Sequence, residues 1–168
     1  LQLIDLFDDS ITELGVPDNS RGMLKFLSLD DTRLLVGTTD GVLVFNKETF
    51  SMVQRIDAVS GLVWAMAQTK SGELWLGSHT HSQGLVNLDK NFNVIRRYSY
   101  EQDLNNNFIM DVTLDQYDQP VIATWGGGIL YRNENEETFR QLDSSDGLLN
   151  DTIQSVFHLG NNQFWLST

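Results

Sequence analysis

The sequence predicts an all-β fold, a β-propeller of four-stranded antiparallel blades, and three observations carry that prediction. A block of fourteen residues recurs four times without a gap, at residues 24–37, 64–77, 110–123 and 154–167. The blocks end in small residues that follow one another at intervals of 40, 46 and 44 residues: Gly37, Gly77, Ala123 and Ser167. A period of about 40 to 50 residues, filled with short strands and turns, is what one propeller blade requires.

Each repeat is expected to form four short strands. In the second repeat they are expected at residues 64–68, 74–78, 84–88 and 94–98, joined by turn-forming residues. The third strand of each complete repeat begins with a glycine, because a small residue there lets the chain re-enter the sheet closely. These glycines are Gly41, Gly84 and Gly128.

The strand pattern divides the chain into three complete blades between two half-blades. Residues 1–19 supply the second half of one blade and residues 147–168 the first half of another. The complete blades are expected at residues 20–59, 60–103 and 104–146. The whole amounts to about four blade equivalents, which we interpret as a fragment of a larger propeller. The half-blades either pair to close a small ring or leave open sheet edges that favour self-association, for example as a homodimer.

The second strand of each repeat is apolar at successive positions, because neighbouring blades cover both faces of a propeller sheet. The small residue near its end is expected where adjacent sheets crowd. Trp75 and Trp165 occupy one column of the repeat and are expected to fill the layer between blades. On this interpretation, truncating either one to alanine costs about 3–5 kcal/mol. A binding platform is the alternative role for this pair.

Composition excludes several classes of function. The chain has 23 Asp and Glu against 11 Lys and Arg, a formal net charge of −12, so its surface repels phosphate backbones and no nucleic-acid partner is expected. It has no cysteine, which excludes disulfides and thiolate metal sites. No apolar run approaches the roughly 20 residues that span a bilayer. No cofactor is expected.

The repeat resembles that of the two-component regulator propeller family. The family pattern, a polar turn followed by a Leu-Trp-Ile-Gly-Thr-like strand, is similar to residues 72–78 (Gly-Glu-Leu-Trp-Leu-Gly-Ser) and, less completely, to residues 163–168. Residues 146–153 and 60–63 look like the family's connections between blades. The resemblance covers nearly the whole chain, although the first repeat has Leu35 where the family has tryptophan. The third repeat departs further, at Pro120, Val121 and Ala123.

The resemblance implies a non-catalytic, ligand-sensing propeller of a bacterial membrane signalling receptor. Such propellers commonly form the periplasmic part of a membrane-anchored receptor. They precede a linking β-domain, a transmembrane helix, and a histidine kinase or diguanylate cyclase as output. In several such receptors the ligand is a carbohydrate. The resemblance therefore implies a periplasmic location, a small-molecule ligand, and the rest of the receptor chain and the membrane as partners.

Candidate ligand-binding residues lie in the loops that a propeller gathers on one face, between second and third strands and between successive blades. Trp125 is placed to stack on a sugar ring. His79 and His81 belong to the same class of loop. Polar side chains that could bond sugar hydroxyls are Asn105, Asn106, Asn107 and Asp151. For each polar residue the alternative is a local hydrogen bond that ends a loop.

Metal and phosphate sites are not expected. His79 and His81 could point the same way from an extended segment, but no third ligand lies nearby in the sequence. The triplet Gly126-Gly127-Gly128 is interpreted as a tight strand connection and not a phosphate loop, because neither a helix nor a lysine follows it.

Two other classes of function stay open. A structural or protein-interaction propeller without a small ligand would present an exposed apolar patch on one rim. A propeller enzyme would need His, Arg and carboxylate groups converging at the axis, and the sequence has no Gly-x-Ser-x-Gly nucleophile motif. The chain is therefore not expected to be an enzyme.

Overall fold

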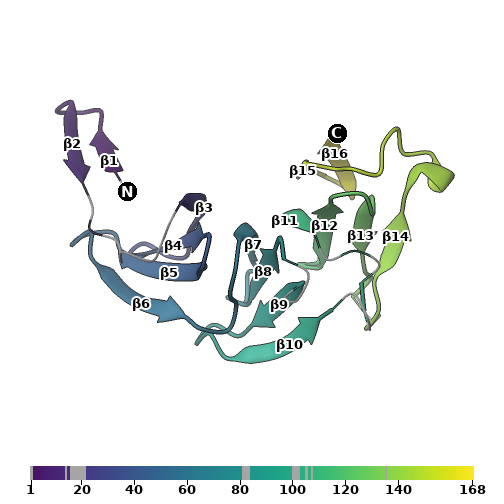
Figure 1. The fold of residues 1–168 in the computed structure, drawn as a ribbon, viewed down its shortest axis with the longest axis horizontal. Helices are drawn as coiled ribbons and strands as arrows, with labels where there is room; N and C mark the ends of the chain where they lie inside the picture. The colour runs from purple at the N-terminus through teal and green to yellow at the C-terminus, as the bar shows by residue number, and fades with distance from the viewer. Residues whose placement is uncertain are drawn as a thin grey trace.

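The structure is a computed structural model that describes residues 2–13, 15, 22–80, 84–99, 103–104, 106, 108–134 and 136–168. Three four-stranded antiparallel sheets lie between two two-stranded hairpins, and all five follow one another along an arc (Figure 1). The predicted fold, an all-β propeller with four-stranded antiparallel blades, is confirmed.

The strands of each sheet follow chain order from the inside of the arc to the outside. The first complete blade contains β3 (Met23–Ser28), β4 (Arg33–Thr38), β5 (Gly41–Asn46) and β6 (Met52–Ile56). The second contains β7 (Val63–Gln68), β8 (Leu74–Ser78), β9 (Leu85–Leu88) and β10 (Val94–Tyr98). The third contains β11 (Ile109–Leu114), β12 (Pro120–Thr124), β13 (Ile129–Tyr131) and β14 (Arg140–Leu142), followed by the short 3-10 helix η1 (Ser144–Asp146).

The two hairpins are separate sheets. One is β1 (Gln2–Asp5) with β2 (Ser10–Glu13), and the other is β15 (Ser155–Gly160) with β16 (Gln163–Ser167). They stand on opposite arms of the arc in Figure 1. Of the two arrangements expected for the half-blades, the structure therefore has the open one, in which they do not pair within one chain.

The strand boundaries of the second blade test the expected pattern most closely. Strands β8 and β10 occupy the residues predicted for them. Strand β7 begins one residue earlier than expected, because Val63 pairs with Ser78 ahead of a bulge. Strand β9 begins one residue later, because Gly84 has a positive φ of 55° and belongs to the preceding turn.

Successive blades touch through one repeated contact, which we call the inter-blade seat. A β-branched residue at or just before the start of an innermost strand lies against the small residue near the end of the preceding blade's second strand. A Cβ added to Gly37 would lie 2.5 Å from the carbonyl oxygen of Val63, and one added to Gly77 would lie 2.4 Å from Cγ2 of Ile109. Ala123 packs in the same core cluster as Ile153. The prediction that the small column lies where sheets crowd is confirmed for Gly37, Gly77 and Ala123, whereas Ser167 is exposed.

The two tryptophans of the repeat column differ in burial. Trp75 is fully buried between the second and third blades, with the tilted Tyr98 ring 5.7 Å away and the Arg132 guanidinium 5.0 Å from its ring centroid. Trp165 is 69% exposed, because the β15–β16 hairpin packs on the third blade with its other face. The prediction that Trp165 fills a layer between blades in this chain is wrong, and so is the stability cost assigned to it.

A buried carboxylate ties three blades together near the inside of the arc. Asp111 on β11 accepts hydrogen bonds from Lys25 Nζ of the first blade at 3.1 Å and from Ser155 Oγ of the last hairpin at 2.9 Å. The backbone N–H groups of Val112 and Val156 also donate to it. These four bonds satisfy a charge that would otherwise be costly to bury. Ala65 occupies the same position of the repeat in the second blade, where it is fully buried.

We expect Gly77→Ala to destabilise the fold by about 2 kcal/mol, because the new Cβ overlaps Ile109 and Ala65 in a seat that is already full. The matched control is Gly15→Ala, where a Cβ meets nothing within 4 Å. Urea denaturation followed by circular dichroism measures both. Equal stability of the two variants would show that the seat does not control the spacing of the blades.

Candidate functional site

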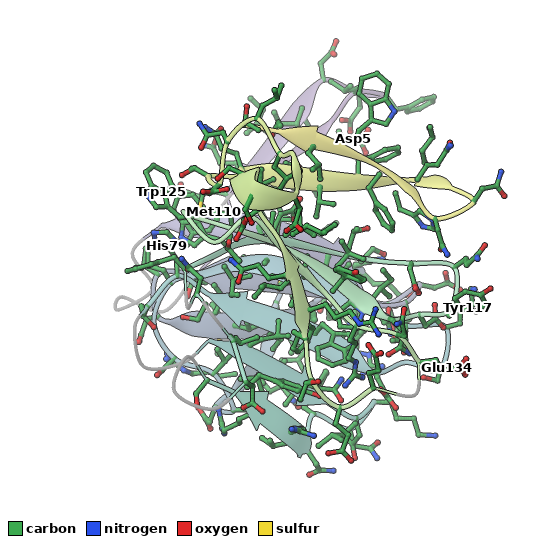
Figure 2. All side chains as sticks on the ribbon, turned by 90° about the vertical axis from the view of Figure 1, so that its right-hand side faces the viewer. Asp5, His79, Met110, Tyr117, Trp125 and Glu134 are labelled. Atoms are coloured by element: carbon green, nitrogen blue, oxygen red, sulfur yellow. The ribbon has the colours of Figure 1, made fainter. Side chains whose placement is uncertain are left out.

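The residue that follows each second strand is fixed in the same way in all three complete blades. The backbone N–H of His79 donates to the carbonyl of Leu62 at 2.8 Å, and that of Trp125 donates to the carbonyl of Phe108 at 3.0 Å. Thr39 makes the equivalent bond in the first blade. Figure 2 shows His79 and Trp125 at one edge of the molecule, with Tyr117 and Glu134 at the opposite edge. We call the edge with His79 and Trp125 the loop face.

A β-bulge interrupts the regular side-chain alternation near the start of each innermost strand, and in the second blade it brings a further ring to the loop face. The register with the second strand skips one residue near the start of β3, β7 and β11. In β7 the skipped residue is Trp64, which is 37% exposed although its neighbours Val63 and Ala65 are fully buried. Bulges of this kind re-aim a side chain out of the regular alternation.

Four rings gather where the second and third blades meet on the loop face: Trp64, His79, Phe108 and Trp125. We call them the aromatic cluster. The imidazole of His79 lies at its centre, with ring centroids 5.6 Å from Trp64 and 5.0 Å from Phe108. Trp125 meets His79 edge-on at 6.5 Å. All three centroid separations lie within the range of about 4.5–7 Å in which aromatic pairs attract each other.

The cluster combines an exposed ring with a neutral imidazole. Trp125 is 54% exposed, which is unusual for the largest apolar side chain. Burial lowers the pKa of the His79 imidazole below its ordinary value, so the ring is neutral at neutral pH. Its Nδ1 is buried without a hydrogen-bond partner among the described residues. The more favourable tautomer carries the proton on Nε2, since a buried unpaired N–H is rarer than a buried unpaired acceptor.

Asn106 braces the two rings of the third blade. Its Nδ2 donates to the carbonyl of Trp125 at 2.9 Å, and its Oδ1 accepts from the backbone N–H of Phe108 at 2.7 Å. The side chain thus fixes the backbone on both sides of the cluster. Asn106 acts here by positioning Trp125 and Phe108.

The glycine triplet forms the turn next to Trp125. The N–H groups of Gly126 and Gly128 both donate to the carbonyl of Asp151, at 3.1 and 2.7 Å. Gly128 has a positive φ of 67°, and a Cβ there would lie 2.0 Å from the carbonyl oxygen of Leu142. These N–H groups are already used, which agrees with the interpretation of the triplet as a tight strand connection.

Asp151 holds a loop beside the cluster. Its carboxylate accepts from the N–H of Ser144 at 2.6 Å and from Ser144 Oγ at 3.0 Å. Its neighbour Thr152 forms an isolated β-bridge with Trp125. The side chain therefore tethers the segment after β14 next to the exposed indole.

The structure brings Trp125, His79, Asn106 and Asp151 together at one place on the loop face. The other predicted site residues, Asn105, Asn107 and His81, lie outside the described residues. Sequence reasoning missed Trp64 and Phe108. Trp64 could have been found from its position in the repeat, because Leu24, Trp64 and Met110 share the position at which the bulge occurs.

Some kinds of site have no basis in the part of the chain that the structure describes. In that part, no group of three or more His, Cys, Asp or Glu is placed to hold a metal ion. None of its helical segments is long and apolar enough to cross a membrane.

Comparison with known proteins identifies the fold of the chain but no sequence family. No family model and no curated protein sequence matches the chain. Among solved structures, the chain is similar to the extracellular domain of a protein named as a hybrid two-component system from B. thetaiotaomicron. The TM-score is 0.85 at 18% identity, and the match covers 99% of this chain and 23% of that one.

Two further structures show how widely the fold is shared. An extracellular domain named for a one-component system of the same organism matches with a TM-score of 0.76 at 20% identity, over 94% of this chain and 21% of that one. Virginiamycin B lyase from S. aureus matches with a TM-score of 0.70 at 12% identity, over 98% and 55%. The chain thus spans about a quarter of the first two structures, and identities this low establish the propeller fold alone.

We expect Asn106→Ala to loosen Trp125 and Phe108, because both bonds of the brace are lost. The free energy of unfolding should fall by about 1–2 kcal/mol and the near-ultraviolet circular dichroism of the aromatic rings should weaken. Asn91→Ala, at an exposed turn, is the control. An unchanged near-ultraviolet spectrum in the Asn106 variant would show that Asn106 does not order the cluster.

Proposed function

We propose that this chain belongs to a non-catalytic, ligand-sensing propeller of the two-component regulator type, in the periplasmic part of a bacterial membrane receptor. The aromatic cluster on the loop face carries the proposal. The likeness to extracellular domains of signalling proteins supports it at the level of the fold. The repeat pattern around Trp75 supports the same assignment from the sequence.

The aromatic cluster suits a small ring-shaped ligand, with a carbohydrate as the leading candidate. A pyranose presents a flat face of C–H groups, and the exposed indole of Trp125 offers a flat surface of matching size. Covering about 100 Å² of apolar surface would stabilise the complex by about 2.5 kcal/mol. The Nε2–H of a neutral His79 supplies a hydrogen-bond donor for a hydroxyl or ring oxygen.

The composition of the cluster supports binding without catalysis. Of its four side chains, only His79 exchanges a proton, and three are hydrocarbon or indole rings. Acid–base chemistry on a bound substrate generally uses two groups with opposed pKa shifts.

The place of the cluster supports a role in signalling. Trp64 and His79 belong to the second blade, and Phe108 and Trp125 to the third. A ligand that contacts both blades binds one arrangement of the pair better than others, which is what a sensor requires. Phe108 directly precedes Ile109, so a displacement of the Phe108 ring would shift Ile109 in its contact with Gly77.

One observation favours a second candidate, a protein-interaction propeller. Phe157 and Trp165 are register partners on β15 and β16, and both are more than 60% exposed. Leu159 lies on the same face and is 57% exposed. Such an apolar face is typical of a contact with another protein.

We expect Trp125→Ala to weaken binding of a carbohydrate ligand about 30-fold, the equivalent of about 2 kcal/mol, through loss of the stacking surface. Its melting temperature should change little, because the ring is half-exposed. The matched control is Tyr117→Ala, an aromatic residue 57% exposed at the opposite edge of the molecule.

The measurement is a screen of the protein against a panel of neutral and charged oligosaccharides, followed by calorimetric titration of the hits. Binding that Trp125→Ala and Tyr117→Ala leave equally strong would move the site away from the loop face. Absence of saturable binding across the panel would favour the protein-interaction propeller.

A further inference from the structure

The aromatic cluster lies among negative charges, and this combination indicates the chemical class of its ligand. We propose that the cluster selects a ligand whose ring carries a protonated amine, of which a sugar with a free amino group is the simplest carbohydrate form. The inference rests on the ligand-binding role proposed above and adds the charge that the ligand carries.

The rings of the cluster suit a cation as well as a flat apolar face. The face of an aromatic ring is the negative end of its quadrupole, and tryptophan attracts a cation more strongly than the other aromatic residues do. Both tryptophans of the cluster are partly open, with Trp64 37% and Trp125 54% exposed. Burial lowers the pKa of the His79 imidazole that contacts them both. The neutral imidazole therefore adds no positive charge that would repel an amine.

The loops of this face carry negative charge only, as far as the structure describes them. Their described residues are 39–40, 57–62, 79–80, 99, 103–104, 106, 108, 125–127 and 143–152. Among these residues there is no Lys or Arg, and there are six aspartates: Asp40, Asp57, Asp103, Asp143, Asp146 and Asp151. An anionic ligand would meet repulsion here, whereas a cationic one is attracted.

Three of these carboxylates are neutralised by ion pairs. Arg55 pairs with Asp40 at 3.0 Å and with Asp57 at 3.6 Å, and Arg96 pairs with Asp103 at 3.1 Å. No Lys or Arg of the described chain lies within ion-pair distance of the other three, which all follow β14: Asp143, Asp146 and Asp151. We call residues 143–151 the acidic segment. A positive group on the ligand would supply its missing countercharge.

The acidic segment is held against Trp125. The carbonyl of Asp151 accepts from the N–H of Gly126 at 3.1 Å, and Thr152 forms a β-bridge with Trp125. The start of the segment folds back on its end, because the N–H of Ser144 donates to the Asp151 carboxylate at 2.6 Å. An amine stacked on Trp125 is therefore attracted by the indole face and by these carboxylates together.

The linker between the second and third blades shows how a following blade meets such a segment. Its Asn106 bonds to the carbonyl of Trp125 in the following blade at 2.9 Å, and Asn150 has the same position of the repeat in the acidic segment. Ser99, the repeat equivalent of Asp143, bonds within its own linker. In a longer propeller the following blade would therefore meet the acidic segment at Asn150 and not at Asp143.

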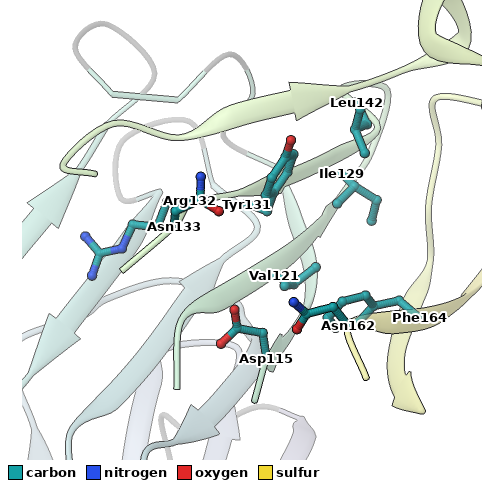
Figure 3. Close-up of a pocket in the computed structure, with 9 residues that line it drawn as sticks. All are labelled: Asp115, Val121, Ile129, Tyr131, Arg132, Asn133, Leu142, Asn162 and Phe164. Atoms are coloured by element: carbon teal, nitrogen blue, oxygen red, sulfur yellow. The ribbon is translucent and has the colours of Figure 1, made fainter. Parts of the chain in front are cut away.

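A groove on the third blade is a separate feature (Figure 3). Its apolar wall is formed by Val121, Ile129, Leu142 and Phe164, and none of the four rings of the cluster lines it. Val121, Ile129 and Phe164 belong to the core that the third blade shares with β15–β16. Packing between blades accounts for the groove, so the amine-bearing ligand is assigned to the cluster alone.

The test compares three tetrasaccharides by calorimetric titration. Tetramers of glucosamine and of N-acetylglucosamine share one backbone and differ only in whether the amine is free or acetylated. A tetramer of galacturonic acid is the anionic probe. A pH of about 6.5 keeps a free amine largely protonated. At this pH the imidazole of His79 stays mostly neutral, since burial lowers its pKa below the usual 6.5.

We expect the glucosamine tetramer to bind about ten times more tightly than the N-acetylglucosamine tetramer, and the galacturonic acid tetramer not to bind. Asp143→Asn combined with Asp146→Asn should reduce the preference to about threefold, because asparagine keeps an acceptor oxygen and loses the charge. Sodium chloride at about 0.5 M should reduce it similarly. The matched control, Asp31→Asn with Glu134→Gln, removes two exposed charges away from the loop face and should leave the preference unchanged.

Two results would overturn the proposal while the ligand-binding function stands. One is binding of the N-acetylglucosamine or galacturonic acid tetramer that equals or exceeds binding of the glucosamine tetramer. The other is a preference that the Asp143 and Asp146 double variant keeps in full, with far-ultraviolet circular dichroism showing that the variant is folded.

Two further results separate the site from general attraction and from failure of the proposed function. Binding of the glucosamine tetramer that survives Trp125→Ala would show attraction to the net charge of −12 and would overturn the site. Binding of other oligosaccharides but of none of these tetramers would overturn the amine class alone. Absence of binding to any oligosaccharide would contradict both the amine class and the proposed function.

Discussion

The arrangement of this molecule depends on the inter-blade seat, in which the start of one innermost strand lies against a residue with almost no side chain on the preceding blade. Ile109 approaches Gly77 so closely that a Cβ on Gly77 would lie 2.4 Å from it. Any larger residue would push the blades apart, because packed interiors have no spare volume. The close approach of the inner strands also brings Asp111 within reach of both Lys25 and Ser155, so one buried carboxylate joins three blades.

The same contact positions the candidate site. Phe108 precedes Ile109 in the chain, and His79 follows two residues after Gly77. Two rings of the aromatic cluster, Phe108 and His79, therefore lie within two residues of Ile109 and Gly77, which set the spacing of the second and third blades. Asn106 and the glycine turn then fix the backbone around Trp125. A ligand bound across these rings acts on the joint between two blades, and the inner strands carry the effect to their neighbours.

Much of the fold could be predicted from the sequence because its cause repeats. The column Gly37, Gly77 and Ala123 recurs with the apolar strand before it, and a repeated column reports a repeated contact. Burial at one position depends instead on what lies opposite, so Trp75 and Trp165 look alike in the sequence and differ in the structure. The site could be predicted in part: Trp125 and His79 follow from their place after a second strand. The bulge that exposes Trp64 and the two hydrogen bonds of the Asn106 side chain depend on local backbone geometry that no repeat reveals.

The four tryptophans offer the most direct test that the aromatic cluster is the ligand site, because each indole N–H gives its own nuclear magnetic resonance signal. The measurement is a titration of nitrogen-15-labelled protein with a binding oligosaccharide. The account predicts shifts of the Trp125 and Trp64 signals, while the buried Trp75 and the half-blade residue Trp165 keep theirs. Shifts confined to Trp165, or to Trp75 alone, would contradict it and place the ligand elsewhere.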